Sequence, residues 1–217
     1  MESGSQSVEA ADWSNAFNAG IAAMEAGKVK DALSELERAT SIAQKNSFTD
    51  ELTDSLVALG DAHRMLGDFK NAETVLSQAV DFSFRNPGKS RLRYAYSLGA
   101  IGRLFVEQNR LDEAMHHLDI AVSILRRSRE KADANFLTVF FALVNCYLGK
   151  KIFDKADELA GYTYALSKEL LGANDPATVM ALTMCIITAE SLGRNYRANE
   201  LRQEMASLLQ SAGKHAT

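Results

Sequence analysis

The chain contains 217 residues, of which 47% are hydrophobic and 24% are charged, and its formal net charge is −4. These values are typical of an ordinary soluble globular protein. Nucleic-acid phosphates require a concentrated basic field, so the acidic balance argues against a nucleic-acid partner. The chain has only two prolines and 13 glycines, which favours long helices over a β protein with many turns.

The start of the chain lacks the charged and apolar regions of a secretion signal. No apolar stretch reaches the roughly 18 residues that a membrane span requires. We therefore expect a cytoplasmic protein that does not insert into membranes. The two cysteines, Cys146 and Cys185, do not have the spacing of a metal site.

The charges are distributed unevenly along the chain. Residues 1–50 carry four cationic and eight acidic side chains, whereas residues 85–131 carry ten cationic and five acidic ones. The basic middle segment is a candidate contact for an acidic partner. The alternative is a solvated surface that contacts no partner.

A repeated pattern runs through the chain and predicts its organisation. Five segments align on one alanine each, and these register alanines are Ala32, Ala72, Ala114, Ala156 and Ala198. The steps between them are 40, 42, 42 and 42 residues. A constant step of this length indicates stacked supersecondary units, and the helical spacing of apolar residues makes each unit a pair of helices.

The predicted elements follow in chain order. Residues 1–10 form a disordered or loosely packed N-terminal segment, a single domain covers residues 11–211, and residues 212–217 form a flexible tail. Inside the domain the repeats cover approximately residues 11–46, 49–86, 89–129, 131–171 and 175–211.

Individual residues mark helix ends and close contacts within these repeats. Asp68 is a predicted N-cap for the second helix of its repeat, and Asp175 followed by Pro176 predicts the start of the fifth repeat. Gly20, Gly60 and Gly102 occupy the same position in three first helices, where a small residue lets two helices approach closely.

These residues resemble the tetratricopeptide repeat. That family has two alanines seven residues apart in the second helix, as in Ala32 with Ala39, Ala72 with Ala79 and Ala114 with Ala121. The 42-residue step and the LGANDPAT run of residues 171–178 are similar to the kinesin-light-chain type of repeat. The resemblance implies an all-α fold, namely a right-handed superhelical α-solenoid of about five helix-turn-helix repeats. Asn109 and Lys151 replace the turn glycine of the family.

The residue types needed for catalysis or metal binding do not cluster in the sequence. His116 and His117 are adjacent, so they point about 100° apart on a helix and cannot form a metal-binding pair one turn apart. Asp112 and Glu113 fall in the first turn of a helix, where negative charge is favourable. We predict that the chain is not an enzyme and that it uses no cofactor and no metal.

The resemblance implies that the first helices line a concave groove. Eleven side chains are expected to lie there: Trp13, Phe17, Ile21, Asp61, Arg64, Tyr96, Arg103, Phe141, Asn145, Met180 and Ile187. Apolar ends flank a polar middle, which suits an amphipathic helix or an extended peptide with apolar anchors and a charged centre. Arg64 and Arg103 would pair with an acidic residue of that ligand.

We therefore predict a non-catalytic adaptor or scaffold that binds a peptide or helix of a partner protein in this groove. One alternative is a homo-oligomeric assembly factor or chaperone. In that case the last helix, with an apolar row of Ala198, Leu201, Met205 and Leu208, would pair in a homodimer because no further helix covers it. A second alternative is a peptide-sensing regulatory protein.

Overall fold

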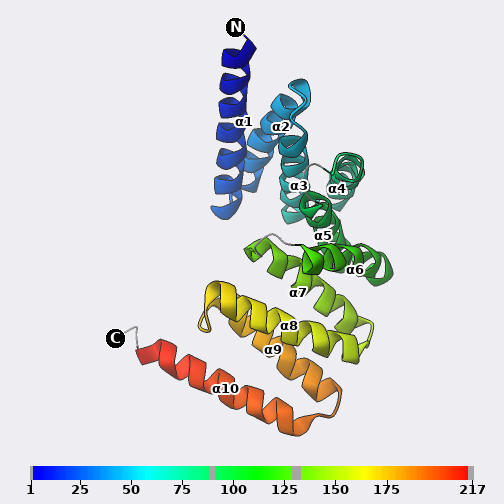
Figure 1. The fold of residues 1–217 in the computed structure, drawn as a ribbon, viewed down its shortest axis with the longest axis vertical. Helices are drawn as coiled ribbons and strands as arrows, with labels where there is room; N and C mark the ends of the chain where they lie inside the picture. The colour runs from blue at the N-terminus through cyan, green and yellow to red at the C-terminus, as the bar shows by residue number, and fades with distance from the viewer. Residues whose placement is uncertain (1, 88–90, 129–132, 215–217) are drawn as a thin grey trace. The chain divides into compact units, whose positions relative to one another are not determined.

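The computed structural model describes residues 2–87, 91–128 and 133–214. Within these ranges it has ten helices and no strand. The helices in chain order (Figure 1) are α1 (Glu2–Glu25), α2 (Val29–Lys45), α3 (Thr49–Met65), α4 (Phe69–Arg85), α5 (Leu92–Glu107), α6 (Leu111–Arg127), α7 (Ala134–Gly149), α8 (Phe153–Leu171), α9 (Pro176–Ser191) and α10 (Asn195–Lys214). The prediction of an all-α repeat solenoid is confirmed.

The helices form two compact units, residues 1–104 and residues 105–217. Within the first unit α1 packs on α2, α2 on α3 and α3 on α4. Within the second, each helix from α6 to α10 packs on the next. Contacts between consecutive helices are those that stacked hairpins make. The single domain over residues 11–211 stays a prediction, and the repeat ends predicted at residues 89, 129 and 131 lie outside the described residues.

Small residues at matching positions allow the helices to pack closely. All five register alanines are fully buried, and so are Ala39, Ala79 and Ala121. A large residue also recurs at the repeat step. Four residues after the register alanine of the first three repeats stands a fully buried leucine, namely Leu36, Leu76 and Leu118. The repeat register predicted from the sequence is therefore confirmed.

Gly20 and Gly60, which occupy the same position in their first helices, lie directly against Leu36 and Leu76. A Cβ atom on Gly20 would lie 2.6 Å from the Leu36 side chain, and one on Gly60 would lie 2.5 Å from the Leu76 side chain. Both distances are far below van der Waals contact. The first helix can pack this closely on the second only because a hydrogen atom stands where other residues carry a side chain.

The turn inside each hairpin contains one residue with a left-handed backbone. These residues recur at the repeat step, and they are Gly27 (φ 72°), Gly67 (φ 74°), Asn109 (φ 58°), Lys151 (φ 58°) and Gly193 (φ 69°). A left-handed residue satisfies carbonyl groups at the end of the preceding helix. Asn109 and Lys151 thus adopt the conformation of the glycines that they replace.

Side-chain caps begin several of the helices. The Asp68 carboxylate accepts a hydrogen bond from the Asn71 amide at 3.3 Å, and the Asp175 carboxylate accepts one from the Ala177 amide at 2.8 Å. Both predicted caps are confirmed. Asp133, which was not predicted, caps α7 by accepting hydrogen bonds from two backbone amides.

Helices extend into both end segments that the sequence analysis set apart from the domain. Helix α1 begins at Glu2, inside the segment that was predicted to be disordered or loosely packed, although Val8 remains 60% exposed. Once α1 is nucleated by its packed part, adding each further residue of this segment to the helix costs little free energy. Helix α10 runs to Lys214, so it enters the predicted flexible tail at residues 212–214. Residues 215–217 lie outside the described part of the chain.

The apolar row of the last helix is covered more than the sequence suggested. Helix α10 packs on α9, with Ala198 fully buried and Leu201, Met205 and Leu208 half-buried. The exposed side chains of α10 are mostly polar. The outward-facing side of α10 is therefore mostly polar.

Candidate functional site

The residues predicted to line a groove divide between the two units. Seven belong to the first unit: Trp13, Phe17, Ile21, Asp61, Arg64, Tyr96 and Arg103. Four belong to the second unit: Phe141, Asn145, Met180 and Ile187.

The apolar residues of α1 are partly used within the first unit. The Trp13 indole N–H donates a hydrogen bond to the Ser55 hydroxyl at 2.9 Å, and its ring stacks on Phe17 with centroids 5.0 Å apart. Phe17 and Ile21 pack against the buried cluster that includes Leu36. All three predicted groove residues are half-buried, so they join neighbouring repeats and leave only part of their surface to a ligand.

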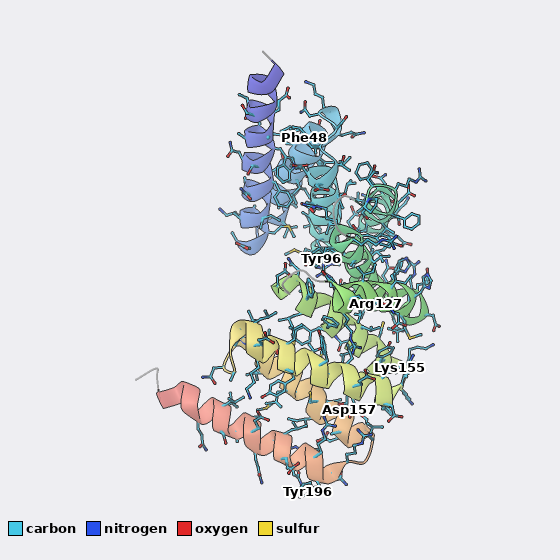
Figure 2. The ribbon with its side chains drawn as sticks, in the orientation of Figure 1. Phe48, Tyr96, Arg127, Lys155, Asp157 and Tyr196 are labelled. Carbon is cyan, nitrogen blue, oxygen red and sulfur yellow. The ribbon has the colours of Figure 1, made fainter. Side chains whose placement is uncertain are left out.

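The predicted polar residues of the first unit form one ion-pair cluster. The Asp61 carboxylate, with 16% of its side chain exposed, accepts from Arg64 Nε at 3.0 Å and from Arg103 Nη2 at 2.6 Å. Two guanidinium groups share this carboxylate. The arginines predicted to meet an acidic ligand therefore already have an acidic partner within the chain. Tyr96, also on the first helix of a repeat, is half-buried (Figure 2).

A second ion-pair cluster in the first unit was not predicted. Arg93 on α5 lies 3.0 Å from Asp54 and 3.0 Å from Asp50, both on α3. Burial raises the pKa of the Asp54 carboxyl, and the hydrogen bond from Arg93 acts in the opposite direction. The sequence contained a signal for these contacts, because Arg93 and Asp54 are 39 residues apart and Arg103 and Asp61 are 42 apart, close to one repeat step.

In the second unit the predicted residues differ in exposure. Phe141 is buried, with 8% exposed, because α7 is apolar on nearly every side and has little outward-facing surface. Asn145 is exposed on the same helix. Met180 and Ile187 on α9 are 46% and 43% exposed. Thr183 and Ile187 follow Met180 by three and seven residues along α9. The three side chains therefore share one exposed helical face.

A buried carboxylate that the sequence did not single out ties the last helices together. Asp157 on α8 has a side chain that is only 7% exposed (Figure 2). It accepts a hydrogen bond from the Thr188 hydroxyl at 3.0 Å and pairs with Arg197 at 2.9 Å and with Arg194. These partners lie on α9, on α10 and in the turn between them, so this carboxylate has a structural role.

The described residues offer little for catalysis. No group of three or more histidine, cysteine or acidic side chains among them could hold a metal ion. Cys146 and Cys185 are both free and buried, and burial raises the pKa of their thiols to about 11 and about 12. Such thiols remain protonated and unreactive near neutral pH. Of the helices described, none is both long enough and apolar enough to cross a bilayer.

Comparison with protein families agrees with this geometry. Residues 51–127 match the family model described as the tetratricopeptide repeat. Over this stretch the chain is similar to tetratricopeptide repeats. The matched region extends from the second repeat through the end of α6, and the register alanines and left-handed turns continue the same pattern on both sides of it.

Solved structures share the fold over most of the chain. TPR-like repeats ascribed to a kinesin light chain of Podosopora anserina superpose with a TM-score of 0.71 at 19% identity, covering 92% of this chain and 95% of theirs. BtubC (BKLC) from P. vanneervenii has a TM-score of 0.69 at 15% identity, with coverages of 85% and 72%. A Rap protein complexed with competence and sporulation factor has a TM-score of 0.64 at 13% identity, covering 91% of this chain and 53% of the Rap chain.

At these identities the likeness is one of fold. The structures that share the fold include repeats ascribed to a kinesin light chain, in agreement with the resemblance expected from the 42-residue step. Comparison with curated proteins found no match. Repeat solenoids of this fold present extended surfaces for binding other proteins.

Proposed function

We propose that this chain is a non-catalytic adaptor that binds a peptide or helix of a partner protein on the first helices of its tetratricopeptide repeats. The observation that carries the proposal is the exposed face of α9. Met180 and Ile187 leave 46% and 43% of their surface exposed there, although most other residues of this helix are buried. Apolar side chains two turns apart are the anchors that an amphipathic helix or an extended peptide uses.

The energetics of this face are those of a reversible contact. Fully burying an exposed Met or Ile side chain contributes about 1.5–3 kcal/mol, so covering the exposed half of each contributes about 1 kcal/mol. Thr183 lies between the two apolar residues and Asn145 is exposed on α7. Their hydroxyl and amide groups can hydrogen-bond the backbone of a bound peptide and fix its position.

The first unit supports the same proposal through its charge. Two guanidinium groups lie beside one carboxylate in the Asp61–Arg64–Arg103 cluster, an arrangement that suits an acidic side chain in the partner. Among the similar structures, a Rap protein was solved in a complex with competence and sporulation factor. A scaffold of this fold can therefore hold a separate molecule.

The test begins with a displayed peptide library selected on the full chain, followed by affinity measurements with one selected peptide. We expect the double variant Met180→Glu/Ile187→Glu to bind that peptide at least about tenfold more weakly, because two charges replace the apolar anchors. The control, Tyr196→Glu/Leu209→Glu, places the same charges on α10 at residues that are 79% and 58% exposed. Equal affinities of the chain and the α9 variant would show that this face is not the binding site.

We also infer a cytoplasmic location, which the two free cysteines support. Buried thiols such as Cys146 and Cys185 remain reduced there, whereas oxidising compartments favour disulfides. Fluorescence microscopy of the tagged full chain checks this location, and a signal confined to another compartment would contradict it.

A further inference from the structure

A cleft lies on another surface of the unit formed by residues 105–217. It has a volume of about 510 Å³ and is lined by residues of α6, α7 and α8. The α7 residues that line it are Leu143 and Tyr147, each two positions from the exposed Asn145. Two positions correspond to about 200° around a helix, so the cleft is on the side of α7 away from the proposed peptide face. It opens between the second helices of two neighbouring repeats.

The acidic side chains that line this cleft are already paired. Asp119 on α6 accepts a hydrogen bond from the Tyr147 hydroxyl. Glu158 on α8 pairs with Arg126 on α6 at 3.6 Å. Both carboxylates are therefore held by partners within the same unit.

The basic side chains of the cleft outnumber its acidic ones. Arg126, Arg127 and Lys155 line it together with Asp119 and Glu158, which leaves one surplus positive charge. Arg127 and Lys155 are exposed, and neither has an ion pair with any residue that the structure describes (Figure 2). The Lys155 ammonium lies 5.6 Å from the centre of the Tyr147 ring, and this cation–π contact stabilises the positive charge without neutralising it.

We propose that this cleft binds an acidic segment of a partner protein, with a carboxylate held between Arg127 and Lys155. Val122 and Leu159 also line the cleft and are buried, so they form an apolar floor for a neighbouring side chain of the segment. A volume of about 510 Å³ falls within the roughly 300–1,000 Å³ of small-ligand sites, so it admits a few side chains and not a folded domain. This contact goes beyond the proposed function because it uses the second helices.

The charges around the cleft favour a peptide carboxylate over a polyanion. A nucleic acid or an anionic bilayer brings many negative charges at once. Asp119 and Glu158 border the cleft and the chain has a net charge of −4, so both oppose such a surface. A segment with one or two carboxylates meets Arg127 and Lys155 without crowding these acids.

The test measures the binding of the full chain to a fluorescein-labelled peptide of alternating glutamate and leucine by fluorescence anisotropy. A matched peptide has glutamine in place of glutamate. We expect the glutamate peptide to bind at least about tenfold more tightly, with an affinity that falls as salt is added. Equal affinity for the two peptides would overturn the proposal.

Two double variants locate the contact. Arg127→Glu/Lys155→Glu should weaken binding of the glutamate peptide at least about tenfold. Lys30→Glu/Lys70→Glu makes the same change in net charge at exposed lysines of α2 and α4 and should leave the affinity unchanged. Circular dichroism verifies that each variant keeps its helix content. An equal loss of affinity in both variants would show that binding depends on net charge alone, and it would overturn the assignment of the peptide to the cleft.

Further arms separate this proposal from its alternatives. Vesicles of phosphatidylserine and phosphatidylcholine test a membrane surface, and vesicle binding that requires Arg127 and Lys155, without peptide binding, would overturn the peptide assignment. The Met180→Glu/Ile187→Glu variant should still bind the glutamate peptide. Loss of binding in that variant would place the acidic segment on α9 and not in the cleft.

Discussion

The Asp157 carboxylate gives the clearest prediction for a single residue. Replacing Asp157 by alanine leaves the Thr188 hydroxyl and two arginines without their acceptor. Arg194 and Arg197 keep 46% and 44% of their side chains exposed, so water hydrates them again and limits the loss. We expect Asp157→Ala to lower the free energy of unfolding by about 2 kcal/mol, measured by urea titration.

Asp154 provides a matched control on the same helix. Its side chain is 85% exposed and its contact with Arg194 measures 3.6 Å. Exposed pairs of this kind contribute little, so Asp154→Ala should change the free energy of unfolding by less than about 0.5 kcal/mol. Equal effects of the two variants would refute the structural role of the buried carboxylate.

The two buried cysteines should make both thiol reactivity and the free energy of unfolding depend on pH. An unfolded cysteine titrates near pH ~8.5, whereas burial raises the pKa of Cys146 to about 11 and of Cys185 to about 12. At pH 9 the folded chain should therefore react slowly with Ellman's reagent, and the urea-unfolded chain should react fast. The unfolded state loses its thiol protons at a lower pH than the folded state. The free energy of unfolding should therefore fall as the pH rises from ~8.5 towards 11. Rapid labelling of the folded chain would contradict the burial of both thiols.

At the scale of structural elements, substitutions in the left-handed turns measure the cost of backbone strain separately from that of side-chain packing. Nothing lies within 4 Å of a Cβ atom built on Gly67, so the cost of Gly67→Ala comes from its φ of +74° alone. We expect a loss of about 1 kcal/mol in the free energy of unfolding. Lys151→Gly removes the same strain and should raise the free energy of unfolding by about 0.5–1 kcal/mol, measured by urea titration. Asn109→Gly should gain less, because asparagine tolerates this conformation. A loss of stability on Lys151→Gly would show that the lysine side chain outweighs its backbone strain.

The hairpins could be predicted from the sequence because packing places a buried alanine at the register position of each of them. The register alanine is buried at every step, and Gly20 and Gly60 lie against a leucine in the first two repeats. The binding surface could be predicted only in part. Periodicity identifies the first helices but does not tell whether Phe141 faces inward, because α7 is apolar on nearly every side. The pairing of Asp61 with Arg103 depends on side-chain geometry across one repeat step, and its pairing with Arg64 on geometry within α3.

At the scale of the whole molecule, the single tryptophan reports on one unit. Trp13 is tied to Ser55 within the first unit, whereas Asp157 lies in the second. Repeat arrays transmit stability through nearest-neighbour contacts. We therefore expect Asp157→Ala to shift the urea midpoint of circular dichroism more than the midpoint of Trp13 fluorescence. Identical shifts of both midpoints would show that the chain unfolds as one cooperative body.

The polar contacts of α3 have a consequence for the order of the repeats. Helix α3 supplies acceptors on both sides, because its Ser55 accepts from Trp13 of α1 and its Asp61 accepts from Arg103 of α5. Deleting the second hairpin would leave donor groups of the first and third hairpins with no acceptor between them. The hairpins are therefore not interchangeable, and a shuffled chain with the same composition would fold less well although each piece retained its own helices.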